Sequence, residues 1–102
     1  MTKIQDLIAA YPGLSRRDRW HMWGRWQLCP MRSIARHVPT EGVIVDMGCG
    51  HGLFTQLLAR ESSQREVFGV DLDARKIEVA QQVTLPNLRY LVGDAAEVDI
   101  PP

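Results

Sequence analysis

The stretch Val43-Ile44-Val45-Asp46-Met47-Gly48-Cys49-Gly50-His51-Gly52 decides the fold of this chain. It begins with β-branched residues, reaches an acid at Asp46, and then carries a glycine at every second position. An apolar run that ends in an acid and a glycine-rich loop is typical of a buried parallel strand whose carboxyl end meets a ligand. Ligands of open α/β sheets bind at that end of the strands. We therefore expect a ligand-binding loop directly after this strand.

The residues after the glycines predict alternating helices and strands. Apolar residues at helical spacing predict a helix over 53–60, and Asp73 is expected to cap a second helix over 74–82. Apolar runs predict strands at 66–71 and 88–92, each preceded by a polar turn, at 61–65 and 84–87. Strands that alternate with short helices imply a parallel sheet with right-handed crossovers. The expected fold class is α/β.

The front of the chain differs from the back in composition. Residues 1–40 contain seven Lys or Arg against two Asp or Glu (+5), and residues 41–102 contain five against ten (−5). The front also has helical patterns, at 3–10, 15–28 and 31–38. We interpret residues 1–41 as a basic helical lead-in or cap, and residues 42–102 as the partial ligand-binding domain.

Three tryptophans recur every third residue in the second of these helices, at Trp20, Trp23 and Trp26, with four arginines among them. One interpretation is a cap helix whose tryptophans pack on the domain while its arginines are solvated, and we favour it. A spacing of three residues drifts around a helix, so at least one of the tryptophans can be exposed or can cover the ligand. The other is a surface on which bases stack and phosphates meet arginines.

The remaining composition excludes several classes of protein. No apolar segment approaches the roughly 20 residues that a membrane-spanning helix needs, and no signal peptide is evident, so a cytoplasmic location is expected. Cys29 and Cys49 are too few for a disulfide framework. The cysteines and histidines lack the close spacing of metal ligands, so no metal site is predicted. His51 is interpreted as a ligand-side or solvent residue rather than a base.

Each of the three predicted strands ends in or next to an acid, at Asp46, Asp71 and Asp94. Asp71 follows Gly48 by 23 positions, the separation at which a second-strand carboxylate meets the hydroxyls of a ribose held over the first loop. A nucleoside ligand is the natural inference. The dinucleotide fingerprint fails, because Leu53 occupies its third glycine position, and the lysine of a phosphate-binding Walker loop is absent.

The pattern that remains, Asp46-x-Gly48-x-Gly50-x-Gly52, resembles the first motif of class I S-adenosylmethionine-dependent methyltransferases. Residues 67–73 and 87–95 resemble the second and third motifs of that family, in the right order. The resemblance implies a partial Rossmann-like sheet with three strands in the spatial order third, second, first, and S-adenosylmethionine as the cofactor. It also implies that the cofactor is bound by Asp46, Gly48, Gly50, Gly52, Asp71, Leu72, Asp94 and Ala95.

Roles follow from the resemblance for these residues. The glycines would line the methionine and ribose part of the cofactor, with Asp46 supporting the loop. Asp71 would hold the ribose hydroxyls and Leu72 would pack on the adenine, whose edge Asp94 and Ala95 would read. An acidic pocket suits a sulfonium cation. Asp46 could alternatively be structural and bond loop amides.

The family resemblance ends where its fourth strand would begin, after residue 102. The first strand would then be an unpaired edge, and we expect it to pair with a second copy, as a homodimer or swapped assembly. The parent reaction would be attack of an acceptor oxygen, nitrogen or carbon on the sulfonium methyl. We expect the 102 residues alone to be inactive, and no catalytic residue is identified. The acceptor is unidentified, and a small molecule, lipid or saccharide is favoured over nucleic acid. A non-catalytic cofactor-binding or assembly module and part of an RNA-directed methyltransferase remain as alternatives.

Overall fold

The computed structural model describes residues 2–94. The first three elements are the helices α1 (Ile4–Ala9), α2 (Arg16–Leu28) and α3 (Met31–Ala35). Strands and helices then alternate, as the spacing predicts. These elements are β1 (Gly42–Met47), α4 (Leu53–Glu61), β2 (Arg65–Asp71), α5 (Ala74–Ala80) and β3 (Leu88–Val92).

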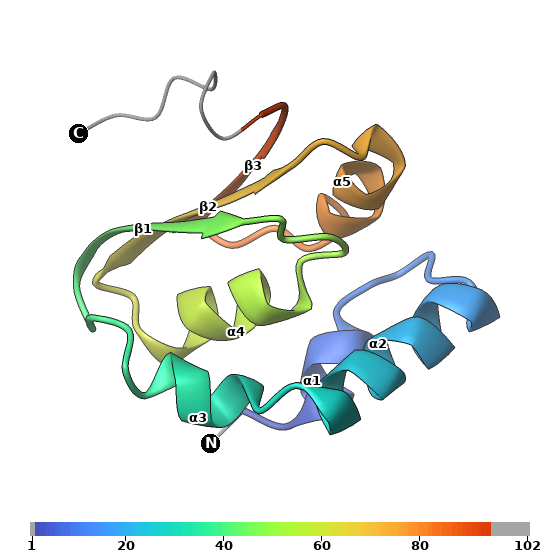
Figure 1. Ribbon diagram of the computed structural model, residues 1–102, viewed down its shortest axis with the longest axis horizontal. Helices are drawn as coiled ribbons and strands as arrows, with labels where there is room; N and C mark the ends of the chain where they lie inside the picture. The colour runs from blue at the N-terminus through green and yellow to red at the C-terminus, as the bar shows by residue number, and fades with distance from the viewer. Residues whose placement is uncertain (1, 95–102) are drawn as a thin grey trace.

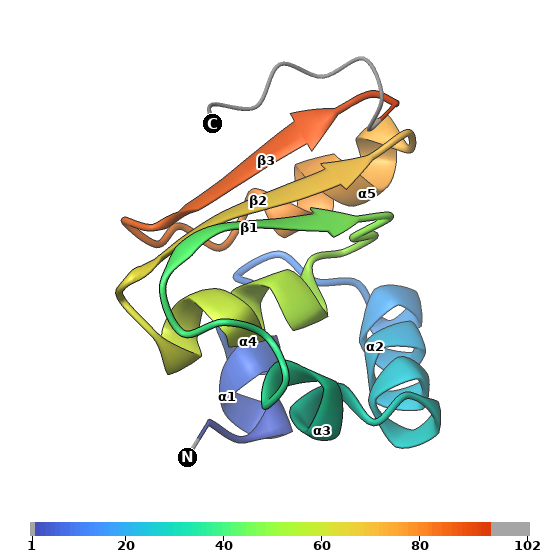
Figure 2. The same cartoon turned by 60° about the vertical axis from the view of Figure 1, so that its left-hand side comes forward.

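The three strands form one parallel sheet in the order β1-β2-β3 (Figures 1 and 2). Val45 lies opposite Phe68 in the first pair, and Phe68 lies opposite Arg89 in the second. This register brings the carboxyl ends of all three strands to one edge. The predicted fold class and strand order are confirmed.

All the helices lie on one side of the sheet (Figure 1). Both crossovers are βαβ units of the same hand, which places α4 and α5 on the same face. The helices α1, α2 and α3 pack beneath α4 and share its core. That core joins residues of all three N-terminal helices to α4 and the sheet, among them Leu7, Tyr11, Met22, Met31, Leu57 and Val67. Whether residues 1–41 form a unit separate from residues 42–102 stays a prediction.

The first strand is not buried, which corrects the expectation from its apolar sequence. Val43, Val45 and Met47 are exposed, and they alternate with Ile44 and Asp46, which face the helices and are half-buried. Within residues 2–94, β1 pairs only with β2 and no helix covers its outer face. The strand therefore has the unpaired, exposed edge that the sequence analysis expected.

The segment 61–65 is not wholly a polar turn, because Arg65 begins β2 and is only 4% exposed. Its guanidinium donates from Nε to the Pro39 carbonyl at 2.8 Å and from NH1 to the Leu58 carbonyl at 2.8 Å. A third bond runs from NH2 to the carbonyl of Val38 at 3.2 Å. The guanidinium can be buried because each of its three nitrogen atoms donates a hydrogen bond to one of these carbonyls. It also joins the end of the helical segment to α4.

The remaining helix predictions hold with two corrections. Ser15 accepts the Asp18 N–H at 3.1 Å and caps α2, and Asp73 caps α5 as expected. However, α3 ends at Ala35 and α5 ends at Ala80, three and two residues earlier than predicted. The tryptophans of α2 do not all pack on the domain, since Trp20 is 79% exposed while Trp23 and Trp26 are half-buried. A spacing of three residues drifts around a helix, so one of the three side chains faces solvent.

We predict that Arg65→Met lowers the free energy of unfolding by about 3 kcal/mol, because it leaves the buried Leu58 carbonyl and two part-buried carbonyls without this donor. Urea denaturation measures the loss. Arg89→Met is the matched control, since Arg89 is exposed on β3 and pairs with the exposed Glu66. That control should cost less than about 0.5 kcal/mol. Equal losses for the two variants would contradict the role given to Arg65.

Candidate functional site

The glycine loop between β1 and α4 folds back on the end of β2. The Gly48 and Cys49 N–H groups both donate to the Val70 carbonyl, at 2.7 and 3.1 Å, and the Gly50 N–H donates to Asp71 Oδ2 at 2.9 Å. Gly48, Gly50 and Gly52 all have positive φ, at 73°, 57° and 82°. Residues other than glycine rarely adopt this backbone conformation. The alternating glycines therefore fix the path of the loop.

Asp71 is the residue on which this edge of the sheet converges. Besides the Gly50 N–H, its carboxylate accepts the Asp73 N–H at Oδ1, at 2.8 Å. Slight burial raises the pKa of Asp71, but the two N–H bonds outweigh it and hold the pKa below its ordinary value. The group is an ionised acceptor at neutral pH. Each carboxylate oxygen has a second lone-pair direction, so both can still accept ribose hydroxyls.

The sequence left open that Asp46 bonds amides of the loop, but its carboxylate bonds a side chain of α4 instead. Its Oδ2 accepts the hydroxyl of Thr55, from α4, at 2.7 Å. The N–H of Gly50, in the loop, donates to Asp71 instead. Burial raises the pKa of Asp46, and the Thr55 hydroxyl and the charge of Arg25 offset only part of that rise. Asp46 therefore ties the end of β1 to the first turn of α4.

Gly52 is buried and lines neither of the two pockets that border the loop. A Cβ atom placed there would lie 2.3 Å from the Tyr90 hydroxyl and 3.0 Å from Ala80 Cβ. Tyr90 Oη also donates to the Gly52 carbonyl, at 3.3 Å. The third glycine is thus required by packing against β3 and α5, whereas the first two border open space.

Two pockets meet at Gly48. The outer one has a volume of about 260 Å³ and is lined by Gly48, Val70, Asp71, Leu72, Gly93 and Asp94. The sequence therefore identified most of this pocket, including Leu72, which is 74% exposed at its rim. Val70 and Gly93 were missed because they contribute backbone at strand ends. Ala95 lies outside the described residues.

The second pocket, of about 180 Å³, lies between the glycine loop and the N-terminal helices. Asp46, Gly48 and Gly50 line it from the loop side, while His21, Arg25 and Met31 are among the residues that line it from α2 and α3. Sequence reasoning placed none of these helical residues in a site. The sequence indicated only that α2 is basic. This pattern does not show which part of the fold the helix packs against.

The thiol of Cys49 lies within this site but is not a reactive group. Burial, together with the charges of Asp46 and Asp71, raises its pKa to about 12. A thiol with so high a pKa is protonated at neutral pH, and the thiolate is the nucleophilic form. Cys49 is therefore a small packing residue of the loop.

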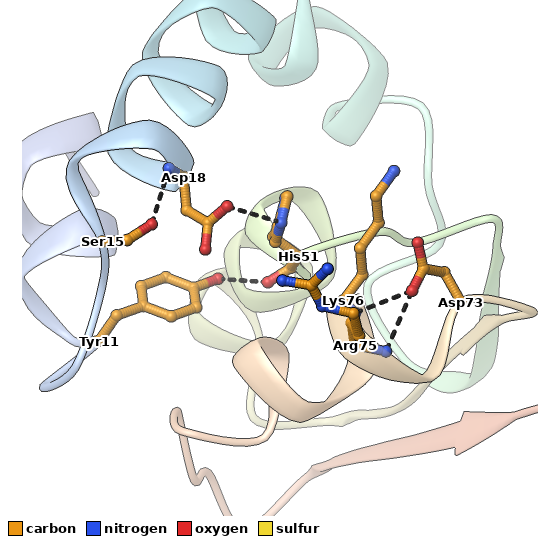
Figure 3. Close-up of polar contacts among 7 residues, drawn as sticks. All are labelled: Tyr11, Ser15, Asp18, His51, Asp73, Arg75 and Lys76. Carbon is orange, nitrogen blue, oxygen red and sulfur yellow. Dashed lines mark hydrogen bonds and ion pairs between the residues drawn. The ribbon is translucent and has the colours of Figure 1, made fainter.

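His51 connects the loop to the N-terminal segment (Figure 3). Its carbonyl accepts the Tyr11 hydroxyl at 2.8 Å, and its Nε2 lies 3.4 Å from Asp18 Oδ1. Burial lowers the pKa of His51, and the nearby Asp18 charge offsets part of this effect. The imidazole thus contacts α2, and His51 also borders the pocket between the glycine loop and the N-terminal helices.

Among residues 2–94, no cluster of three or more Cys, His, Asp or Glu side chains has an arrangement that could hold a metal ion. In the same part of the chain, no helix combines the length and the apolar character needed to cross a bilayer.

Residues 44–102 match the family described as "Methyltransferase domain". A trans-aconitate 2-methyltransferase of Deinococcus radiodurans is 34% identical over 83 residues, which are 79% of this chain and 32% of that protein. A malonyl-[acyl-carrier protein] O-methyltransferase of Priestia megaterium is 36% identical over 61 residues, 59% of this chain and 22% of that protein. The chain thus spans about a third or less of these relatives.

Solved structures show the same arrangement. A TehB-like SAM-dependent methyltransferase from Corynebacterium glutamicum superposes with a TM-score of 0.55 at 27% identity, over 84% of this chain and 50% of that one. Coclaurine N-methyltransferase, solved with N-methylheliamine and SAH, gives a TM-score of 0.62 over 72% of this chain and 24% of that one. At 16% identity, the second likeness concerns the fold alone.

We predict that Asp46→Asn stabilises the protein. A carboxyl whose pKa is higher in the folded state holds its proton more tightly there, so its ionisation destabilises the fold as pH rises above the ordinary value of 3.8. The asparagine keeps an acceptor for Thr55 without the charge. Urea denaturation should therefore show a higher free energy of unfolding for the variant at about pH 7 and little difference at about pH 3. A variant less stable at neutral pH would contradict this account.

Proposed function

Because the chain belongs to the methyltransferase-domain family, we propose that it binds S-adenosylmethionine at the carboxyl edge of its sheet, for methyl transfer to a small acceptor. The observation that carries the proposal is the position of Gly48, which borders both pockets. A cofactor with its adenosine in the outer pocket can direct its sulfonium over Gly48 into the inner one. We assign cofactor binding to these 102 residues, and methyl transfer to the protein that contains them.

The outer pocket has the chemistry of an adenosine site. The ionised Asp71 supplies two acceptors for ribose hydroxyls, and the exposed Leu72 offers an apolar surface for the adenine ring. Asp94 lies at the same pocket, where an acceptor can read the adenine amino group. The acids also favour a cationic sulfonium, whereas a phosphate-containing nucleotide would be repelled.

For the acceptor we propose a small carboxylic acid, which is esterified on oxygen. Arg25 and Lys76 both line the inner pocket and can pair with a carboxylate. The names of the two curated relatives support the same class, since trans-aconitate and a malonyl group both carry carboxylates. A non-catalytic cofactor-binding module remains the second candidate.

This acceptor class explains why no general base is needed. A carboxylate is ionised at neutral pH and has no proton to lose before it attacks. Its oxygen forms a bond to the methyl carbon as the carbon–sulfur bond breaks, and the electron pair of that bond leaves with sulfur as a neutral thioether. The protein contributes mainly by holding the oxygen, carbon and sulfur in line.

We predict that Asp71→Asn weakens the binding of S-adenosylhomocysteine by about 10-fold or more, because hydrogen bonds to a charged group contribute about 1.5–3 kcal/mol. Isothermal titration calorimetry measures the change. Asp73→Asn is the matched control, since Asp73 is a neighbouring acid that caps α5 and does not line the outer pocket. Equal affinity of the Asp71 variant and the wild type would contradict the ribose assignment.

We predict that Arg25→Gln weakens the binding of trans-aconitate to the S-adenosylhomocysteine complex by about 10-fold, through loss of a charge-assisted bond. The affinity for S-adenosylhomocysteine should not change. Arg19→Gln is the control, because Arg19 lies on the same helix outside this pocket. A single-stranded oligoribonucleotide is titrated in parallel, since Trp20, Arg16 and Arg17 are exposed and keep the RNA-directed alternative open. Salt-sensitive RNA binding with no trans-aconitate binding would overturn the proposed acceptor.

We also propose that the 102-residue chain associates through the exposed edge of β1, as an open strand edge invites pairing with another chain. Light scattering at about 100 micromolar should then report a dimer, and Val45→Lys should yield a monomer, because charge on an edge strand opposes pairing. Thr84→Lys adds the same charge to an exposed loop and should leave the dimer intact. A monomeric wild type at that concentration would contradict this proposal.

A further inference from the structure

The glycine loop is held at its middle by two residues from the N-terminal segment. Tyr11 and Asp18 both contact His51, the residue between the second and third glycines (Figure 3). The first contact is a hydrogen bond to the His51 backbone, and the second is a polar contact of 3.4 Å between the Asp18 carboxylate and Nε2 of the imidazole. The ring of His21 adds an edge-on packing contact with the same imidazole, with the centroids 5.4 Å apart.

Both contacting residues are themselves fixed in place. Tyr11 is only 4% exposed and belongs to the core, so its ring has little freedom to follow a moving loop. Asp18 lies in the first turn of α2, a helix of 13 residues whose backbone fixes its position. The loop therefore rests against two rigid supports. Neither support borders the outer pocket, so neither is expected to touch the adenosine.

The position of His51 matters because its neighbour carries the key amide. Gly50 donates its N–H to Asp71, the proposed ribose-binding acid, at 2.9 Å. Gly50 itself has no side chain that could hold this amide in place by packing. If the His51 contacts are lost, the loop can move, and the Gly50 N–H then moves away from the carboxylate.

We propose that Tyr11 and Asp18 are positioning residues for the cofactor, which act through His51 to hold the Gly50 amide against Asp71. The inference rests on the proposed function, since it concerns the same cofactor site. Binding free energies are reciprocal, so a bound cofactor stabilises the contact between α2 and the loop by the same amount. Because Arg25 of α2 lines the inner pocket, cofactor binding also helps to complete the acceptor site.

The test compares Asp18→Ala and Tyr11→Phe with Ser15→Ala in the full 102-residue chain. Each of the first two variants should weaken S-adenosylhomocysteine binding by about 3- to 10-fold, the range expected for one hydrogen bond or charge contact. The double variant Asp18→Ala/His51→Asn should bind S-adenosylhomocysteine no more weakly than Asp18→Ala alone or His51→Asn alone, because the two substitutions remove the same contact. Ser15→Ala weakens the α2 cap but leaves the His51 contacts, and it should keep the wild-type affinity.

A second measurement does not depend on the cofactor. Amide hydrogen exchange of Gly50 in the free protein should be faster in Asp18→Ala and Tyr11→Phe than in the wild type, and unchanged in Ser15→Ala. Wild-type affinity together with wild-type Gly50 exchange in the Asp18 and Tyr11 variants would overturn the inference and leave the proposed function intact. An equal loss of affinity in Ser15→Ala would also overturn it, because the effect would then be general destabilisation of α2. If the wild type itself does not bind S-adenosylhomocysteine, the proposed function fails, and the inference fails with it.

Discussion

The hydrogen bond from the Gly50 N–H to the Asp71 carboxylate joins every part of the site. The parallel register places Met47 opposite Val70, so the loop that leaves β1 emerges level with the acid that ends β2. The same carboxylate accepts the Asp73 N–H, and Asp73 in turn caps α5. One charged group therefore fixes the loop, the strand end and the start of the next helix. Its remaining lone pairs face a pocket, where hydroxyl groups of a ligand can complete its coordination.

The two acids at this edge show how environment separates residues of the same type. Asp71 accepts two backbone N–H bonds and its pKa is lowered, whereas Asp46 is buried beside α4 and its pKa is raised. Asp71 is thus stabilised as a carboxylate by the fold. The Asp46 charge is instead maintained at a cost in stability, and Thr55 and Arg25 only partly compensate for it. A buried acid that opposes folding is a common sign of a group retained for function.

The N-terminal helices are part of the site as well as of the core. They pack on α4 through residues such as Leu7 and Met31, and their inner surface closes the second pocket over the loop. Arg65 strengthens this arrangement, because its three hydrogen bonds join the chain before β1 to the end of α4. The basic front of the chain consequently lies beside the acidic strand ends. This juxtaposition places acidic groups beside cationic ones, as the proposed sulfonium cofactor and carboxylate acceptor require.

The sequence by itself determined the order of strands and helices, the parallel sheet and most of the outer pocket. These follow from local patterns: apolar periodicity, the Asp73 cap, glycines at alternate positions, and acids at strand ends that a parallel sheet must bring together. Only the tertiary structure decided that β1 has an exposed face, that Gly52 serves packing against Tyr90, and that Arg65 is buried. It alone also brought Tyr11, Asp18 and Arg25 to the glycine loop. These contacts join residues that lie far apart in the chain, 40 positions in the case of Tyr11 and His51. No local pattern encodes which surfaces meet when α2 packs beside the glycine loop.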